Sequence, residues 1–142
     1  MPSFLKTNKP LLTVMIKQTQ NPDNIISEIG RALNMGAEAF GLQTEGLPRK
    51  YHTKEIMNSI FLATKGRPLY VTNYKLAENK NMTYDEIADE LKLYADLGVT
   101  LCDVMGDMYC KHEGELTDNK EAIEKQMELI DELHSRNTEV LM

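Results

Sequence analysis

The segment HSRNTEVLM, residues 134–142, distinguishes between the folds that the sequence allows. It contains the polar end of a helix, a single turn residue at Asn137 and a short apolar strand, after which the sequence stops. A run of this kind is typical of a strand that lies between two others in a parallel sheet. The fold therefore depends on the elements that precede this strand and on the neighbours that it pairs with.

The preceding sequence alternates strands and helices in strict order. The apolar run LLTVMI, residues 11–16, is typical of a strand that is covered on both faces. Helix signals follow each strand, for example Asn21 with Pro22 at one start and a capping box of Thr83 and Glu86 at another. The predicted order is βαβαβαβαβ, with strands at 11–16, 37–43, 68–74, 99–105 and 138–142 and helices starting at Asn21, Thr53, Thr83 and Asp118.

The helix that precedes the last strand is predicted to be the longest. Asp118 and Glu121 have the side chains expected at a helix start. Apolar residues and one histidine then recur at the spacing of a single helix face. This stripe consists of Ile123, Met127, Ile130 and His134.

Strict alternation implies a parallel sheet with helical crossovers, and two architectures share this pattern. One is a (βα)8 barrel, of which this chain supplies about half, and the other is an open, flavodoxin-like five-stranded sheet. An open sheet of that type normally ends with a helix that covers its last strand, and no helix follows residues 138–142. We therefore predict a single half-barrel domain over residues 1–142, with the open sheet as the alternative.

Composition and charge exclude several classes of function. The chain has 142 residues, of which 42% are hydrophobic and 27% charged, as in ordinary globular domains. Its formal net charge of -6 disfavours nucleic acid, because such partners are bound through clustered Lys and Arg. No apolar run is long enough to span a bilayer, and the first ten residues lack the apolar core of a signal peptide. We expect a cytoplasmic protein with no membrane partner and two free thiols.

The lengths of the connections predict where the functional site lies. Connections from helix to strand are short, whereas those from strand to helix are longer, and they are longest after Met105. The long loops therefore gather at the carboxyl ends of the strands, where both architectures place their active sites. The first of these loops, residues 17–24, lacks the glycines of a phosphate cradle, which disfavours an open-sheet nucleotide or flavin binder.

Three stretches give the chain a family resemblance: GAEAFGLQTEGL at 36–47, PLYVTNYK at 68–75 and the run from Glu115 to Met142. From about Pro10 onward, the sequence resembles a divergent branch of the type I 3-dehydroquinate dehydratases. The resemblance implies a (βα)8 barrel that dehydrates 3-dehydroquinate through a Schiff-base lysine and a catalytic histidine. The lysine and the histidine would both lie beyond Met142. We therefore expect residues 1–142 to be inactive alone and to bind no cofactor.

The candidates for contact with a small-molecule substrate are polar residues at the carboxyl ends of the strands, where inward side chains can meet a ligand. They are Gln43, Thr72, Lys75 and Asp103. The resemblance matches Thr72 and Asp103 to positions of the family's substrate-contacting motifs. The usual Glu-x-Arg-x-Asp run is replaced here by residues 41–45, and Tyr74 stands where the family has an arginine. Lys75 follows one residue later, but a lysine does not provide the planar fork of an arginine. The substrate of this chain is therefore not fixed by the resemblance.

Two further hypotheses come from the residues themselves. The loop after the fourth strand groups possible metal ligands, but the spacing of its two cysteines matches no common zinc pattern, so we predict no metal. These ligands are Cys102, Asp103, Asp107, Cys110 and His112.

A half barrel also has two open sheet edges, and open edges are templates for pairing. The alternative function is accordingly a non-catalytic binding module or a homodimer formed through these edges.

Overall fold

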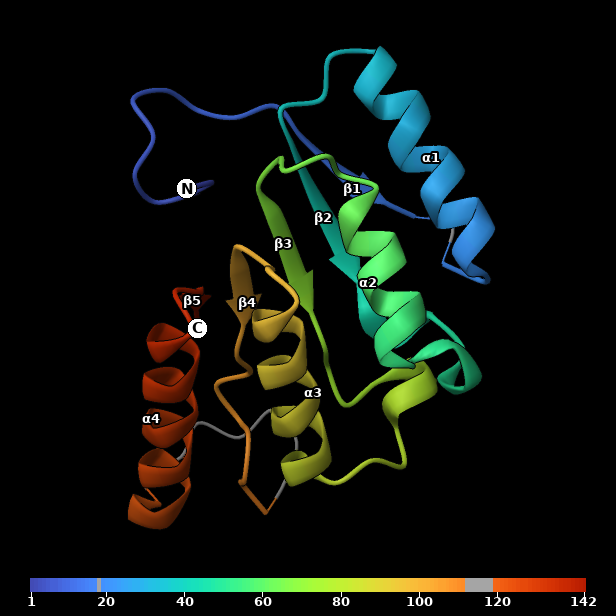
Figure 1. Cartoon of the computed structure of the whole chain (residues 1–142). Helices are drawn as coiled ribbons and strands as arrows, with labels where there is room; N and C mark the ends of the chain where they lie inside the picture. Colours follow the sequence, from blue (N-terminus) through green and yellow to red (C-terminus); the bar gives the residue numbers. More distant parts are fainter. Residues whose placement is uncertain (18, 112–118) are drawn as a thin grey trace.

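The computed structural model describes residues 1–17, 19–111 and 119–142. Its five strands form one parallel sheet in the order β1-β2-β3-β4-β5, and four helices connect them (Figure 1). The strands are β1 (Thr13–Ile16), β2 (Ala39–Gln43), β3 (Leu69–Thr72), β4 (Leu101–Asp103) and β5 (Glu139–Leu141). The helices are α1 (Pro22–Asn34), α2 (Lys54–Leu62), α3 (Tyr84–Asp96) and α4 (Lys120–Ser135), and the short 3₁₀ turns are η1 (Thr44–Gly46), η2 (Arg49–Tyr51) and η3 (Ala77–Asn79).

The strand order is that of a barrel segment. Strands that follow one another in sequence also pair with one another, and right-handed crossovers then place every helix on the same face of the sheet. Figure 1 shows α1 to α4 along one face. A flavodoxin-like sheet has the order 2-1-3-4-5, with β1 inside the sheet. The structure thus has the α/β fold that we predicted, in the strand order of a half barrel.

The face of the sheet that is covered by helices forms the core. Phe40, Leu42, Val71 and Cys102 are buried there against the helices. Side chains alternate along a strand, so the intervening residues face the other side, which is the inner face of the barrel. One row of paired residues on this inner face consists of Met15, Gly41, Tyr70, Leu101 and Glu139.

The predicted helix starts are confirmed where the structure describes them. Asn21 caps α1 by accepting a hydrogen bond from the amide of Asn24. Thr83 and Glu86 form the reciprocal capping box of α3. Asp118 lies outside the described residues, and the described cap of α4 is Asn119. Local side-chain chemistry thus fixes where these helices begin.

The prediction that the first strand is covered on both faces is wrong. Leu12 is 59% exposed and Met15 is 38% exposed, whereas Ile16 is buried. The described helices all lie on the same face of the sheet, so the other face of this strand, which carries Met15, has no helix over it. The segment before β1 crosses toward the opposite edge of the sheet (Figure 1). There the hydroxyl of Ser3 and the amide of Phe4 donate to the carboxylate of Glu139.

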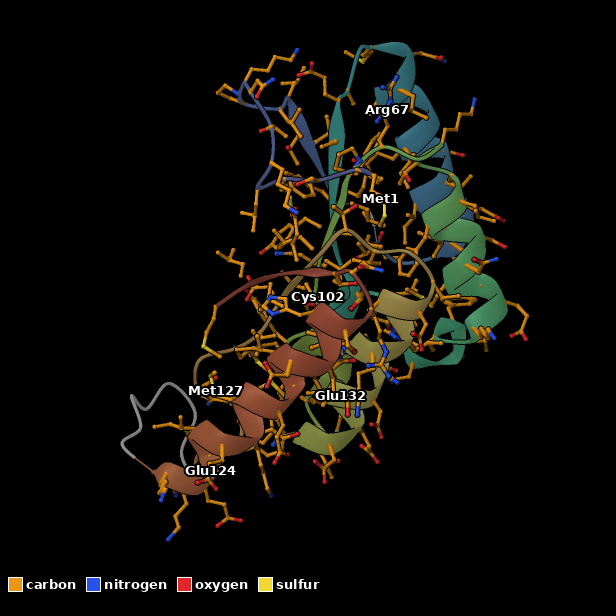
Figure 2. All side chains as sticks on the ribbon, turned by 60° about the vertical axis from the view of Figure 1, so that its left-hand side comes forward. Met1, Arg67, Cys102, Glu124, Met127 and Glu132 are labelled. Atoms are coloured by element: carbon orange, nitrogen blue, oxygen red, sulfur yellow. The ribbon has the colours of Figure 1, made fainter. Side chains whose placement is uncertain are left out.

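The apolar stripe predicted for the last helix is not its buried face. Ile123 is 41% exposed and Met127 is 52% exposed. The sheet instead packs against a stripe about a quarter turn away, which consists of Ala122, Gln126, Leu129 and Leu133. Figure 2 shows Met127 and Glu132 on different sides of α4, with Glu132 toward α3. The predicted stripe therefore faces away from α3. On that side of α4 no further helix is described.

Candidate functional site

The carboxyl ends of the last three strands surround a cavity of about 420 Å³. Its walls come from the segment after β3, from the end of β4 and the residues that follow it, from the start of α3 and from Met142 after β5. This is the edge at which the long loops were predicted to gather. The lining residues are Tyr74, Lys75, Leu76, Tyr84, Asp103, Val104, Met105, Gly106, Asp107 and Met142.

Asp103 is the polar centre of the cavity. Its Oδ2 atom accepts a hydrogen bond from the hydroxyl of Tyr70 at 2.6 Å and another from the hydroxyl of Tyr74 at 2.7 Å. Burial, together with the Asp103 carboxylate, raises the pKa of Tyr74 to about 12 and raises that of Tyr70 further above its ordinary value. Both phenols therefore remain protonated donors at neutral pH and hold the carboxylate in one orientation.

Lys75 supplies the positive charge of the cavity wall. It follows Tyr74 directly, and its ammonium nitrogen lies 5.1 Å from the centre of the Tyr84 ring. The negative face of an aromatic ring attracts a cation at this distance. The ammonium is thus held at the mouth of the cavity by the first residue of α3.

Thr72 is connected to the cavity through a second carboxylate. Its hydroxyl lies 3.0 Å and 2.9 Å from the two carboxylate oxygens of Glu45, a buried residue of η1. The same carboxylate accepts a hydrogen bond of 3.3 Å from the backbone amide of Tyr74. The end of β2 is thereby linked to the segment that carries the cavity residues.

The four predicted site residues have different positions. Lys75 and Asp103 line the same cavity. Thr72 is buried beside it and contacts Glu45 instead. Gln43 pairs with Thr72 in the sheet register, but its side chain is exposed and does not line the cavity.

Two residues of this site, Tyr70 and Glu45, were not predicted. A signal for Tyr70 was present, because it lies two residues before Thr72 and therefore shares its face of the strand. Glu45 falls at the acidic last position of the Glu-x-Arg-x-Asp run, but this position did not indicate its contacts with Thr72 and Tyr74, which cross 27 and 29 positions of the chain. Only the folded arrangement brings these residues together.

Behind the cavity wall, a buried polar network fixes the loops. His52, with its side chain 1% exposed, has Nε2 at 2.7 Å from the carbonyl oxygen of Leu47 and Nδ1 at 3.0 Å from the hydroxyl of Tyr94. Glu90 accepts hydrogen bonds from Arg49 and from the side-chain amide of Asn73. His52 is thus occupied by structural contacts, and it does not line the cavity.

The possible metal ligands of the sequence are divided between two faces of the sheet. Cys102 is buried in the core, and burial raises the pKa of its thiol to about 12, whereas Asp103 faces the cavity. Cys110 is also buried, and His112 lies outside the described residues. Among the residues that the structure describes, no three His, Cys, Asp or Glu side chains are placed to hold a metal ion.

Comparison with known proteins gives no family for the chain. No protein-family model matches it, and no curated protein matches it at a significant level. Within the described residues, no helix has the length and apolar character needed to cross a membrane.

Proposed function

We propose that residues 1–142 form the substrate-binding part of a dehydroquinase-like barrel. In this proposal the cavity binds a small hydroxylated carboxylic acid of the 3-dehydroquinate type. The observation that carries it is the placement of Lys75 and Asp103 on one cavity at the carboxyl ends of parallel strands, the edge where barrel enzymes bind their ligands. The family resemblance of the sequence supports the same ligand class.

The charges of the cavity favour a ligand with one acidic group and several hydroxyls. Lys75 offers one positive charge to a carboxylate. Asp103 also lines the cavity, and carboxylate oxygens accept hydrogen bonds from hydroxyl groups. A ligand with two or more negative charges would be repelled by this carboxylate. The apolar side chains of Val104 and Met105 can cover the carbon skeleton of the ligand.

We propose that residues 1–142 alone bind the ligand without dehydrating it. Schiff-base chemistry requires a neutral lysine amine and a general acid-base group beside it. Lys75 lies over the aromatic ring of Tyr84, which suits a charged ammonium that binds an anion. His52 is held in the buried network, and His134 is exposed near the end of α4. Neither histidine lines the cavity.

Calorimetric titration with 3-dehydroquinate tests this proposal. We expect saturable binding, which Asp103→Asn and Lys75→Met each weaken by about tenfold, the effect of losing one charge-assisted hydrogen bond. Lys120→Met is the matched control, because Lys120 is exposed on α4 and lies outside the cavity. Equal affinity in all four proteins, or no binding by the unmodified chain, would refute the proposal. The absorbance of the conjugated product should not rise during the titration.

A second candidate function is self-association, which one observation favours specifically. Large apolar side chains are exposed at the open side of the half barrel: Ile123 and Met127 on α4, Leu141 on β5, and Met15 on β1. Strands β1 and β5 are the edges of the sheet. Pairing of β5 with β1 of a second copy would cover these strand edges, as barrels do by closure.

Sedimentation of the unmodified chain and of Met127→Glu tests self-association. We expect a dimer that the substitution shifts toward monomer, because it places a charge in the covered surface. Leu62→Glu is the control, since Leu62 is 67% exposed on α2, away from the open side. A monomer at every concentration would exclude this candidate and leave ligand binding unaffected.

A further inference from the structure

Glu45 is a buried carboxylate that the proposed ligand contacts do not use. The residue is only 6% exposed. In the described part of the chain, no Lys, Arg or His nitrogen lies within 4 Å of its carboxylate, so its partners are neutral donors. Burying a carboxylate without a cation is unfavourable unless hydrogen bonds compensate it, which raises the question of what purpose these bonds serve here.

The partners of Glu45 suggest that purpose. One is the hydroxyl of Thr72 at the end of β3, and the other is the backbone amide of Tyr74 two residues later. Glu45 therefore spans the point where the chain leaves the sheet. It fixes the backbone of Tyr74 and so sets the direction in which Lys75 continues.

The side chain of Tyr74 is held at its other end by Asp103, whose Oδ2 accepts the phenol proton at 2.7 Å. Tyr74 is thus bound at its amide by one carboxylate and at its hydroxyl by another. Neighbouring Thr44 adds a contact of the same kind, because its hydroxyl lies 2.7 Å from the carbonyl oxygen of Thr72. The 3₁₀ turn η1 therefore holds the segment after β3 through two successive residues.

We infer that Glu45 is a positioning residue for the cavity: its carboxylate fixes the Tyr74 backbone and thereby places the Tyr74 hydroxyl and the Lys75 ammonium for ligand binding. The expected effect of Glu45 on ligand binding rests on the proposed function. The restraint of the Tyr74 backbone by Glu45 does not require any ligand. The restraint and the effect on binding can therefore be measured separately.

Amide hydrogen exchange, followed by NMR, measures the restraint. In Glu45→Ala the Tyr74 amide loses its acceptor, so we expect it to exchange at least about tenfold faster, with amides in α1 unchanged. Glu45→Gln retains a side-chain carbonyl oxygen and should restore most of the protection. Glu55→Ala, a change at an exposed residue of α2, is the control. Unchanged exchange of Tyr74 in Glu45→Ala would overturn the inference.

Calorimetric titration with 3-dehydroquinate measures the consequence for binding. We expect Glu45→Ala to weaken binding by about tenfold and Glu45→Gln to weaken it much less, in parallel with their Tyr74 exchange rates. Thr72→Val removes the other donor but keeps the carboxylate, and it provides a second variant if Glu45→Ala does not fold. In this variant we expect the Tyr74 amide to exchange a few-fold faster. An unchanged exchange rate would count against the inference.

The two proposals fail in different ways. If the unmodified chain does not bind 3-dehydroquinate, the proposed function fails, and the exchange rate of Tyr74 still decides the role of Glu45. If the chain binds but Glu45→Ala binds equally well, the positioning role is wrong and the proposed function stands. Weakened binding with unchanged Tyr74 exchange would mean that Glu45 does not act through Tyr74.

Discussion

The guanidinium of Arg49 and the carboxylate of Glu90 form a two-pronged ion pair that joins the loop after β2 to helix α3. Nη1 donates to Oε1 at 3.1 Å, and Nη2 donates to Oε2. A fork of this kind matches the geometry of a carboxylate and holds it more firmly than a single contact does. The pair lies behind the cavity and is joined there by His52 and Tyr94. It therefore stabilises the loops from which the site is built.

This network predicts how the stability of the protein depends on pH. Burial opposes the charge on Glu90, but the neighbouring His52 ring, with Nδ1 3.6 Å from Oε1, and the hydrogen bonds from Arg49 outweigh it and lower the pKa from 4.5 to about 2. A carboxyl whose pKa is lower in the folded state stabilises fully above its ordinary pKa and loses that contribution as the pH falls toward the folded value. We expect the free energy of unfolding to fall by roughly 1–2 kcal/mol from this group between about pH 5 and pH 2, since solvent screens the pair in part.

Urea denaturation at several pH values measures this dependence. Glu90→Gln should flatten the decline of the unfolding free energy across the same range, because the neutral amide does not titrate. An equal decline in Glu90→Gln and in the unmodified protein would show that other carboxyls cause it. Glu124→Gln, a change at an exposed residue of α4, serves as the control.

The capping box of α3 predicts a loss of stability of moderate size. The hydroxyl of Thr83 accepts the amide proton of Glu86 at 3.1 Å, and the Glu86 carboxylate accepts that of Thr83 at 2.9 Å. Thr83→Ala should lower the free energy of unfolding by about 1 kcal/mol, because an amide in the first turn loses its partner. Thermal or chemical denaturation measures the change. No loss at all would contradict the cap.

The two stripes of α4 predict effects of different size when their side chains are truncated to alanine. Leu129 is buried against the core, so Leu129→Ala should lower the free energy of unfolding by about 2–4 kcal/mol. Ile123 is exposed on the other stripe, and Ile123→Ala should change the free energy by about 0.5 kcal/mol or less in the monomer. Chemical denaturation of the two variants at low protein concentration distinguishes them. A reversed order would show that the stripe predicted from the sequence faces the core.

Local signals in the sequence were sufficient to predict the element order. Asn21 and Thr83 have helix-capping side chains, and Gly36 and Gly98 occupy positive φ angles at +92° and +94°, where a side chain would be strained. These features act within a few residues, so a single sequence reveals them. Strict alternation then implied a parallel sheet, and the structure has one.

Features that depend on distant partners could not be predicted in the same way. The stripe of Ile123 and Met127 has the correct helical period, but periodicity does not say which neighbour a stripe faces. Asp103 and Lys75 were predicted because they stand at the carboxyl ends of strands, which is a positional rule. Glu45 was not predicted, since nothing in its own segment indicates that Tyr74 will lie beside it.

NMR titration of the labelled chain with 3-dehydroquinate decides whether the cavity beside Asp103 binds a hydroxylated carboxylic acid. We expect the backbone signals of Lys75, Asp103 and Val104 to shift together and reach saturation, while those of α1 stay unchanged. Signals that do not move, or shifts confined to residues outside the cavity, would show that the cavity does not bind this ligand.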